Sequence, residues 1–197
     1  TGRNLDTFPP DEKAVGWKDT ESTADQVRSH GRRALSLIVD VTNRQHVQTM
    51  IDRTVEEFGR VDILINNAAF ARGPDRVPIL DLDPDIFQKV VDIKITGTYL
   101  CTKAFVQALK DQGHGGKIVN VSSTAAFQPG PLKAVYYATK HYVQAYSEAL
   151  YEEWKGHRVS VTALCPGATQ SGFQQAADIF IRCQNGGLDP RFFDMFD

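Results

Sequence analysis

Short apolar, β-branched segments alternate with longer amphipathic segments along the chain. The apolar segments cover residues 34–39, 61–65, 117–121 and 159–164, and glycine, proline or polar residues separate them from what lies between. Runs of this length and composition are typical of buried strands in a parallel sheet. The sequence therefore predicts an α/β protein in which strands alternate with helices.

The amphipathic segments carry helix start and stop signals. Thr42 can cap a helix whose apolar stripe ends at Gly59, and Asp83 with Pro84 at the first helical position starts another. Residues 5–20 are polar with two consecutive prolines and predict a surface loop. The expected helices run over about 22–31, 42–59, 84–112 and 136–154.

Composition narrows the function classes. The 197 residues are 42% hydrophobic and 23% charged with a net charge of −2, so a single domain over residues 1–197 is expected, with no basic stripe for nucleic acid. No run approaches the ~18 apolar residues of a membrane span. The three cysteines show no paired or metal-ligand spacing, which predicts reduced thiols, no metal and a cytoplasmic location.

One tyrosine and one lysine form the leading candidate for chemistry. On a helix, side chains four residues apart lie on one face, about 6 Å apart, and an ammonium there favours the phenolate for acid–base work. Ser123 lies 13 residues before Tyr136 and follows an expected strand, at the edge where open α/β sheets place ligands. The other two pairs at this spacing lack such a serine. The three pairs are Tyr99–Lys103, Tyr136–Lys140 and Tyr151–Lys155.

With these landmarks in order, the chain resembles the short-chain dehydrogenase/reductase family over residues 34–171, in particular its 3-oxoacyl-reductase-like branch. Asn66, Asn67, Ala68 and Ala69 follow a strand as the family's Asn-Asn-Ala-Gly does. The resemblance implies a Rossmann-type doubly wound parallel sheet. It also implies a small alcohol or ketone substrate, NAD or preferably NADP as cofactor, and a homodimer or homotetramer.

The resemblance also implies roles for individual residues. Tyr136 would give or take the hydroxyl proton, Lys140 would favour its phenolate and hold the nicotinamide ribose, and Ser123 would hydrogen-bond the carbonyl oxygen. Arg3 could meet a 2′-phosphate and so favour NADP. The other cofactor-binding positions that the resemblance implies are Asp40, Val41, Asn67, Ala68, Pro166, Gly167 and Thr169.

Two departures from the family pattern bear on mechanism. Lys94 stands where the family has an asparagine that kinks a helix and holds a proton-relaying water. A lysine has only donors, so it could hold a substrate carboxylate or a water, or could point to solvent. If it points inward, it lies near Lys140, and each charge disfavours the other. The family's first strand and glycine-rich phosphate turn have no match in the sequence, so we expect a chain that is incomplete at both ends.

Two other functions stay open. The chain could be a non-catalytic partner or structural subunit of the same fold, which Lys94 and the unmatched glycine turn favour and the intact Ser123, Tyr136 and Lys140 oppose. A sugar-nucleotide epimerase or dehydratase of the extended family fits less well, because those enzymes lack the Asn-Asn-Ala segment and this serine spacing. The preferred interpretation is an NAD(P)-dependent oxidoreductase.

Overall fold

The computed structural model describes residues 19–70 and 74–167. The chain divides into two compact units, one comprising residues 40–166 and the other comprising residues 1–39 and 167–197. Arg3 and Thr169 lie outside the described residues.

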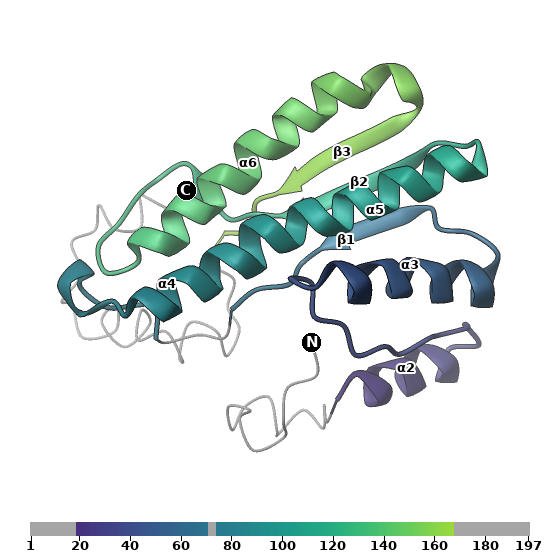
Figure 1. The fold of residues 1–197 in the computed structure, drawn as a ribbon, viewed down its shortest axis with the longest axis horizontal. Coiled ribbons are helices and arrows are strands. Elements are labelled where there is room, and N and C mark those ends of the chain that lie inside the picture. The colour runs from purple at the N-terminus through teal and green to yellow at the C-terminus, as the bar shows by residue number, and fades with distance from the viewer. Residues whose placement is uncertain (1–18, 71–73, 168–197) are drawn as a thin grey trace. The chain divides into compact units, whose positions relative to one another are not determined.

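A parallel sheet forms the centre of the unit 40–166. Its strands are β1 (Ile63–Asn66), β2 (Gly116–Val121) and β3 (Val159–Leu164), in that order across the sheet. Asn66 pairs with Asn120 and Val121 with Leu164, so all three strands end at one edge. The three strands run side by side beneath two long helices in Figure 1. The apolar runs therefore predicted these three strands to within two residues at each end.

Helices connect the strands. The element preceding β1 is α3 (Arg44–Phe58), and α6 (Ala134–Trp154) lies between β2 and β3. The predicted helix from Pro84 to Gln112 is built as α4 (Pro84–Val91), a π-helical segment (Asp92–Thr96) and α5 (Gly97–Gln112). Short 3-10 turns complete this unit, at Ile79–Asp81, Thr124–Ala126 and Lys155–His157.

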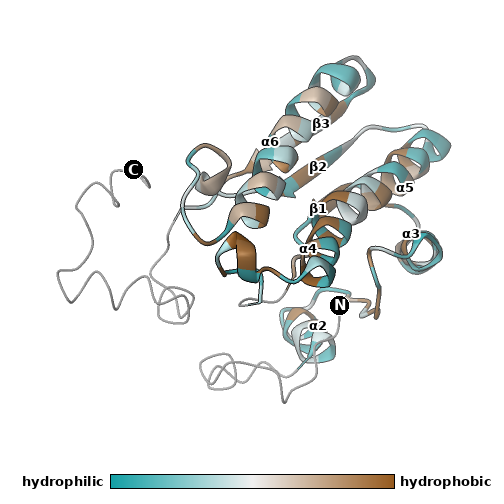
Figure 2. Ribbon diagram, turned by 60° about the vertical axis from the view of Figure 1, so that its left-hand side comes forward, coloured by the Kyte–Doolittle hydropathy of each residue, from teal (hydrophilic) through white to brown (hydrophobic). Residues whose placement is uncertain are grey.

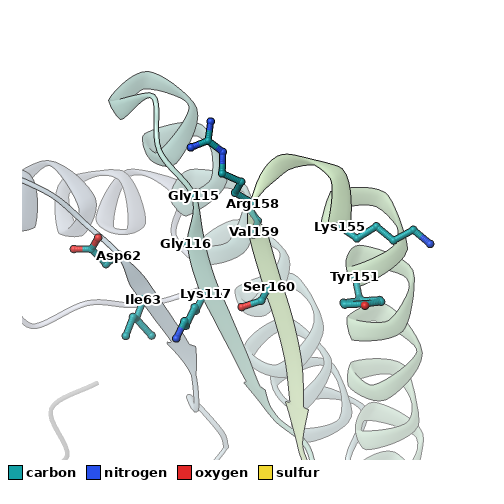
Figure 3. A pocket seen from close by; sticks show the side chains of 10 residues that line it. All are labelled: Asp62, Ile63, Gly115, Gly116, Lys117, Tyr151, Lys155, Arg158, Val159 and Ser160. Atoms are coloured by element: carbon teal, nitrogen blue, oxygen red, sulfur yellow. The ribbon is translucent and has the colours of Figure 1, made fainter.

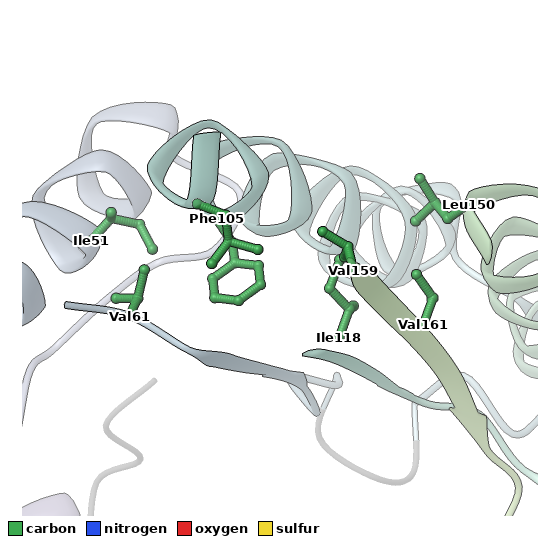
Figure 4. Packing of buried hydrophobic residues seen from close by; sticks show 8 residues of the cluster. Ile51, Val61, Phe105, Ile118, Leu150, Val159 and Val161 are labelled. Atoms are coloured by element: carbon green, nitrogen blue, oxygen red, sulfur yellow. The ribbon is translucent and has the colours of Figure 1, made fainter. Parts of the chain in front are cut away.

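The hydrophobic core lies between the helices and one face of the sheet. Both α5 and α6 carry apolar and polar bands along their length (Figure 2), as expected of helices that cover a sheet on one side. Figure 4 shows Phe105 and Leu150 directed toward the strands. Phe105 is 1% exposed, and burying such a ring stabilises the fold by about 2–3 kcal/mol. The cluster consists of Ile51, Val61, Phe105, Leu109, Ile118, Leu150, Val159 and Val161.

A buried polar network crosses this core close to the strand ends. The Asn66 amide donates to Asn120 Oδ1 at 2.8 Å and to Thr102 Oγ1 at 3.2 Å. Asn120, which is fully buried, donates in turn to Ser147 Oγ at 2.9 Å. Because each buried polar group has a partner, the network joins β1, β2, α5 and α6 in one register.

The described part of the other unit contains α2 (Thr20–Ser29). Asp19 caps it by accepting a hydrogen bond from the backbone N–H of Ser22, and the helix thus begins two residues before the predicted start near residue 22. The strand predicted at residues 34–39 does not form. A strand needs a hydrogen-bonded neighbour, none of the described residues pairs with this segment, and Ile38 is 83% exposed.

The cap predicted for α3 is shifted by one residue. Asn43 caps the helix by accepting hydrogen bonds from the backbone N–H groups of Gln45 and His46. Thr42 instead donates to the Asp40 carboxylate. The predicted stop at Gly59 is confirmed, since Gly59 adopts the left-handed conformation, φ 86°, that ends a helix.

Candidate active site

Lys94 lies in the π-helical segment between α4 and α5. Its backbone carbonyl accepts a hydrogen bond from the Thr98 hydroxyl at 2.8 Å. In this turn the backbone N–H of Gly97 donates to the carbonyl of Asp92, five residues earlier, instead of four residues earlier as in an α-helix. The side chain is 5% exposed, so the alternative in which Lys94 points to solvent was wrong. Its ammonium lies 4.7 Å from the centre of the Tyr136 ring.

The first turns of α6 bring Tyr136 and Lys140 to the same place. The Lys140 ammonium lies 5.8 Å from the Tyr136 ring centre, as the spacing of four residues predicted. Lys140 is 9% exposed, and its ammonium donates a hydrogen bond to the carbonyl of Val121 at 2.7 Å. The last residue of β2 thus fixes the position of the lysine against the tyrosine.

The two serines after β2 have different tasks. Ser122 is buried and donates from its hydroxyl to the Lys140 backbone carbonyl at 3.0 Å. Ser123 is half-buried and caps the 3-10 turn that follows, accepting from the backbone N–H of Ala125 at 3.2 Å. That turn packs against α6. The structure therefore joins Ser123 to the helix that carries Tyr136 and Lys140.

Both lysines hold their protons weakly. Burial lowers the pKa of Lys94 to about 8; the Asp75 carboxylate opposes this and Arg76 adds to it. Burial lowers the pKa of Lys140 to about 7, and the positive charge of Lys94 lowers it further, with Cys165 opposing. The expected repulsion between the two ammonium groups is confirmed. With a pKa of about 7, Lys140 exists in both its protonated and its neutral form near neutral pH.

Further charges surround Tyr136 on the side of Lys94. Asp75 is 6% exposed, in the segment that precedes α4. Burial lowers the pKa of Lys133, the residue that precedes α6, and Arg76 lowers it further while Asp75 opposes. Burial also raises the pKa of Tyr137, with Arg76 opposing. Arg76 is therefore close enough to Lys94, Lys133 and Tyr137 for its charge to act on them, and Asp75 is close enough to act on the two lysines.

A glycine brings the turn at Asp40 and Val41 against the same helix. A Cβ atom at position 97 would lie 2.7 Å from Val41 Cγ2, so only glycine allows α5 to approach this closely. The Asp40 carboxylate accepts from the Thr42 hydroxyl at 2.7 Å and from its backbone N–H at 2.9 Å, and these bonds lower the pKa of Asp40. Both residues predicted to face the adenine are thus held on a defined turn.

The remaining predicted cofactor residues follow the strand ends. Asn67 and Ala68 come directly after β1 and are exposed. Pro166 follows β3, and its carbonyl accepts from the backbone N–H of Thr124 at 3.2 Å, which ties it to the turn that begins at Ser123. Gly167 comes next and is exposed. The parallel sheet therefore gathers the candidate residues of the unit 40–166 at its carboxyl edge.

The two competing tyrosine–lysine pairs lie elsewhere. Lys103 donates to the Tyr99 hydroxyl at 3.4 Å on the exposed side of α5. Tyr151 and Lys155 border a hollow of about 600 Å³ at the amino-terminal ends of the three strands (Figure 3). This hollow lies at the edge of the sheet opposite Ser123, so its size does not make it the site of the chemistry.

Sequence reasoning missed several residues of the site. Ser123 was selected by its spacing from Tyr136, but no role was predicted for Ser122, because only a fold that places α6 beside β2 gives the Ser122 hydroxyl a partner. Asp75, Arg76 and Lys133 lie in segments without periodicity, so no sequence pattern marked them. The charges of Asp75 and Arg76 matter because their loop brings them close enough to act on Lys94 and Lys133.

Within residues 19–70 and 74–167, no helix is long and apolar enough to cross a membrane. The same residues contain no group of three or more His, Cys, Asp or Glu side chains placed to hold a metal ion.

Comparison with known proteins assigns the family. The family model for short chain dehydrogenases matches residues 14–179. The chain is 35% identical over 156 residues to a short chain dehydrogenase/reductase from Aspergillus oryzae, covering 79% of this chain and 59% of that protein. It is also 35% identical over 158 residues to the 2-dehydro-3-deoxy-D-gluconate 5-dehydrogenase of Escherichia coli, covering 79% of this chain and 61% of that enzyme.

A solved structure agrees. The structure of NAD+-bound xylitol dehydrogenase superposes with a TM-score of 0.75 at 29% identity, over 83% of this chain and 62% of that one. The chain spans about three fifths of the length of the curated relatives it matches. Tyr136 and Lys140 lie together at the carboxyl edge of a Rossmann-type parallel sheet, and Ser123 begins the turn that packs against their helix. Since the family model also matches residues 14–179, the chain belongs to the short-chain dehydrogenase/reductase family.

Proposed function

We propose that the protein transfers a hydride reversibly between NAD(P)(H) and an alcohol or ketone, with Tyr136 as the general acid and base. The observation that carries this proposal is the position of the Lys140 ammonium, buried and 5.8 Å from the Tyr136 ring centre at the carboxyl edge of the sheet. The names of the relatives, a gluconate-derivative dehydrogenase and a xylitol dehydrogenase, support alcohol and ketone chemistry.

The residues of the site divide the work of moving one proton. Tyr136 would donate its hydroxyl proton to the carbonyl oxygen during reduction and take it back during oxidation. Lys140, held by the Val121 carbonyl and by Ser122, would stabilise the negative charge that the phenol oxygen gains. The Ser123 hydroxyl would hydrogen-bond the substrate oxygen, because it lies on a turn fixed against α6.

The residues present fit the adenine and nicotinamide ends of a dinucleotide. Gly97 lets Val41 lie close to α5, and Asn67, Ala68, Lys140 and Pro166 follow or face the carboxyl strand ends. When bound, the cofactor supplies or accepts the hydride. The sequence matches no glycine-rich turn for the pyrophosphate, so the 197-residue chain is expected to bind a dinucleotide weakly. NADP over NAD stays a prediction that depends on Arg3.

Assembly and environment follow from the same proposal. A homodimer or homotetramer, a small-molecule partner and a cytoplasmic location stay predictions. Tyr142 and Tyr146, whose rings stack with their centres 5.6 Å apart on α6, would serve the core or a subunit interface. The competing function is that of a non-catalytic subunit of the same fold. It would give no reason for burying the two charged side chains Lys94 and Lys140 beside Tyr136.

Replacing Tyr136 with phenylalanine tests the proposal. The change deletes one hydroxyl and little volume, so turnover should fall by about 10²–10⁴ or more while dinucleotide affinity is retained. Tyr151→Phe is the matched control, because Tyr151 lies on the same helix about 22 Å further along its axis. Turnover by Tyr136→Phe at the wild-type rate would favour the non-catalytic alternative.

A further inference from the structure

Two buried ammonium groups lie close to the ring of Tyr136. The Nζ atom of Lys94 is 4.7 Å from the ring centre and that of Lys140 is 5.8 Å from it, so the two nitrogens are at most about 10.5 Å apart. The two lysines are 5% and 9% exposed, so solvent and salt screen one charge from the other only weakly. Each ammonium therefore acts on the other more strongly than two exposed lysines at the same distance would.

No ion pair among the described residues offsets this repulsion. The carboxylates in the ion pairs of residues 19–70 and 74–167 bond to other cations, and neither Lys94 nor Lys140 takes part in one. The Lys140 ammonium donates to the carbonyl of Val121 at 2.7 Å, which is a neutral acceptor. That bond fixes where the ammonium lies but does not cancel its charge. Lys140 therefore cannot move away from Lys94 without losing its hydrogen bond.

The groups that act on Lys140 come from three elements. Tyr136 lies on the same helix, Lys94 in the π-helical segment, and Cys165 directly after β3, where its thiol donates to the Gln144 side chain at 3.2 Å. Burial lowers the pKa of Lys140 to about 7, Lys94 lowers it further and Cys165 opposes. Burial and the charge of Lys94 thus act in the same direction on the proton of Lys140.

Lys94 carries its own charge in the pH range where Lys140 loses its proton. Burial lowers the pKa of Lys94 to about 8; Asp75 opposes this and Arg76 adds to it. At pH 7 most of the protein therefore has a charged Lys94, whereas about half has a charged Lys140. A change of charge at residue 94 should consequently be felt at Lys140 near neutral pH.

We propose that Lys94 is a positioning residue that controls the charge of Lys140 through space and thereby sets the pH range of turnover. The proposal rests on the proposed function for the reaction that Lys140 assists. During reduction of a ketone, Lys140 must be charged to stabilise the phenolate that forms when Tyr136 gives up its proton. A cation at residue 94 confines fast reduction to lower pH, and a neutral residue there would extend it to higher pH.

Titration of Lys140 by NMR tests this control without turnover. The protein is labelled with ¹³C at the lysine Cε atoms, and the Lys140 signal is identified by its loss in Lys140→Arg. We expect a midpoint near pH 7 in the wild-type protein and about one pH unit higher in Lys94→Met, the effect of one charge about 10 Å away at an effective dielectric constant of about 20. Lys103→Met is the matched control, because Lys103 is an exposed lysine 5.8 Å from the ring centre of Tyr99. It should leave the midpoint unchanged.

A conservative variant separates charge from structure. Lys94→Arg keeps a cation at every accessible pH, so the midpoint of Lys140 should stay at or below that of the wild-type protein. Equal midpoints in the wild-type protein and Lys94→Met would overturn the proposal. A midpoint that rises in Lys94→Arg as far as in Lys94→Met would also overturn it, because the effect would then not depend on the charge.

The pH dependence of turnover distinguishes this proposal from the proposed function. For reduction of a small ketone, the alkaline decline of kcat/KM should move about one pH unit higher in Lys94→Met and should not move higher in Lys94→Arg or Lys103→Met. A decline that stays in place while the NMR midpoint moves would overturn the proposal and leave the hydride-transfer function standing. A midpoint that moves as expected, found together with wild-type turnover by Tyr136→Phe, would refute the proposed function and leave the control of Lys140 by Lys94 standing.

Discussion

Replacing Lys94 with methionine should make the folded protein more stable at neutral pH. Methionine keeps the length and helix propensity of the lysine and removes only its charge. In the folded protein that charge is buried, lacks an ion pair among the described residues and repels Lys140. An unpaired buried charge is costly, so its removal should stabilise the fold.

The magnitude follows from the displaced pKa. The ordinary value of 10.5 holds in the unfolded chain and about 8 in the folded one, so near pH 7 ionisation of Lys94 costs the folded state about 3 kcal/mol. The cation–π contact with the Tyr136 ring, lost in the variant, contributes about 1 kcal/mol in the opposite direction. The cost of burial is larger. A net gain of about 2 kcal/mol is expected.

The sign of the pH dependence is fixed by the same shift. Between about pH 8 and 10.5 the unfolded chain binds more protons at this lysine than the folded one, so this residue makes the wild-type protein more stable as pH rises. The gain from Lys94→Met should therefore shrink to below about 0.5 kcal/mol near pH 10.5. Cys101 and Tyr146, whose pKa values burial raises to about 11 and about 12, act oppositely but equally in both proteins.

Urea unfolding of the wild-type protein and the variant, followed across this pH range, measures the difference directly. Lys103→Met is the matched control, because Lys103 is exposed; its change should stay within about 0.5 kcal/mol at every pH. If Lys94→Met were destabilising at pH 7, or if its effect did not change with pH, Lys94 would be neutral or paired in the folded protein. The electrostatic account of the site would then fail.

Two further changes test how the fold positions the site. Asn120→Ala should lower the free energy of unfolding by about 2–4 kcal/mol, because it leaves a buried space and removes one hydrogen bond each from the Asn66 amide and the Ser147 hydroxyl. A loss no larger than that of the exposed Thr162→Ala would contradict this. Gly97→Ala should place a methyl group 2.7 Å from Val41 and cost about 1–3 kcal/mol, measured by urea unfolding. Adding Val41→Ala should recover part of that loss, and no recovery would show that the strain lies elsewhere.

The pattern of apolar residues predicted the part of the fold that is determined locally. The runs before Asn66, Ser122 and Cys165 became the three parallel strands, because each is short, β-branched and bounded by breakers. The run at residues 34–39 has the same composition and forms no strand. A strand depends on a neighbour as much as on its own sequence, and the described residues offer none to this segment.

The candidate site was predictable where helix geometry fixed it. The spacing of Tyr136 and Lys140 sufficed to place their side chains together, and the serine spacing selected this pair over the exposed ones. The inward position of Lys94 was one of several open alternatives, because periodicity does not determine where a side chain points in a π-helical turn. The charges of Asp75 and Arg76 come from an irregular loop and became visible only in the folded chain.

Transfer of deuterium from a labelled cofactor tests the central claim most directly. The protein is incubated with NADH or NADPH deuterated at the transferring position and with a set of small ketones, and the products are analysed by mass spectrometry. We predict that the wild-type protein delivers the deuterium to the carbonyl carbon of a ketone and that Tyr136→Phe does so at least about 100-fold more slowly. Products without deuterium, or equal transfer by both proteins, would contradict the assignment of Tyr136, Lys140 and Ser123 to hydride-transfer chemistry.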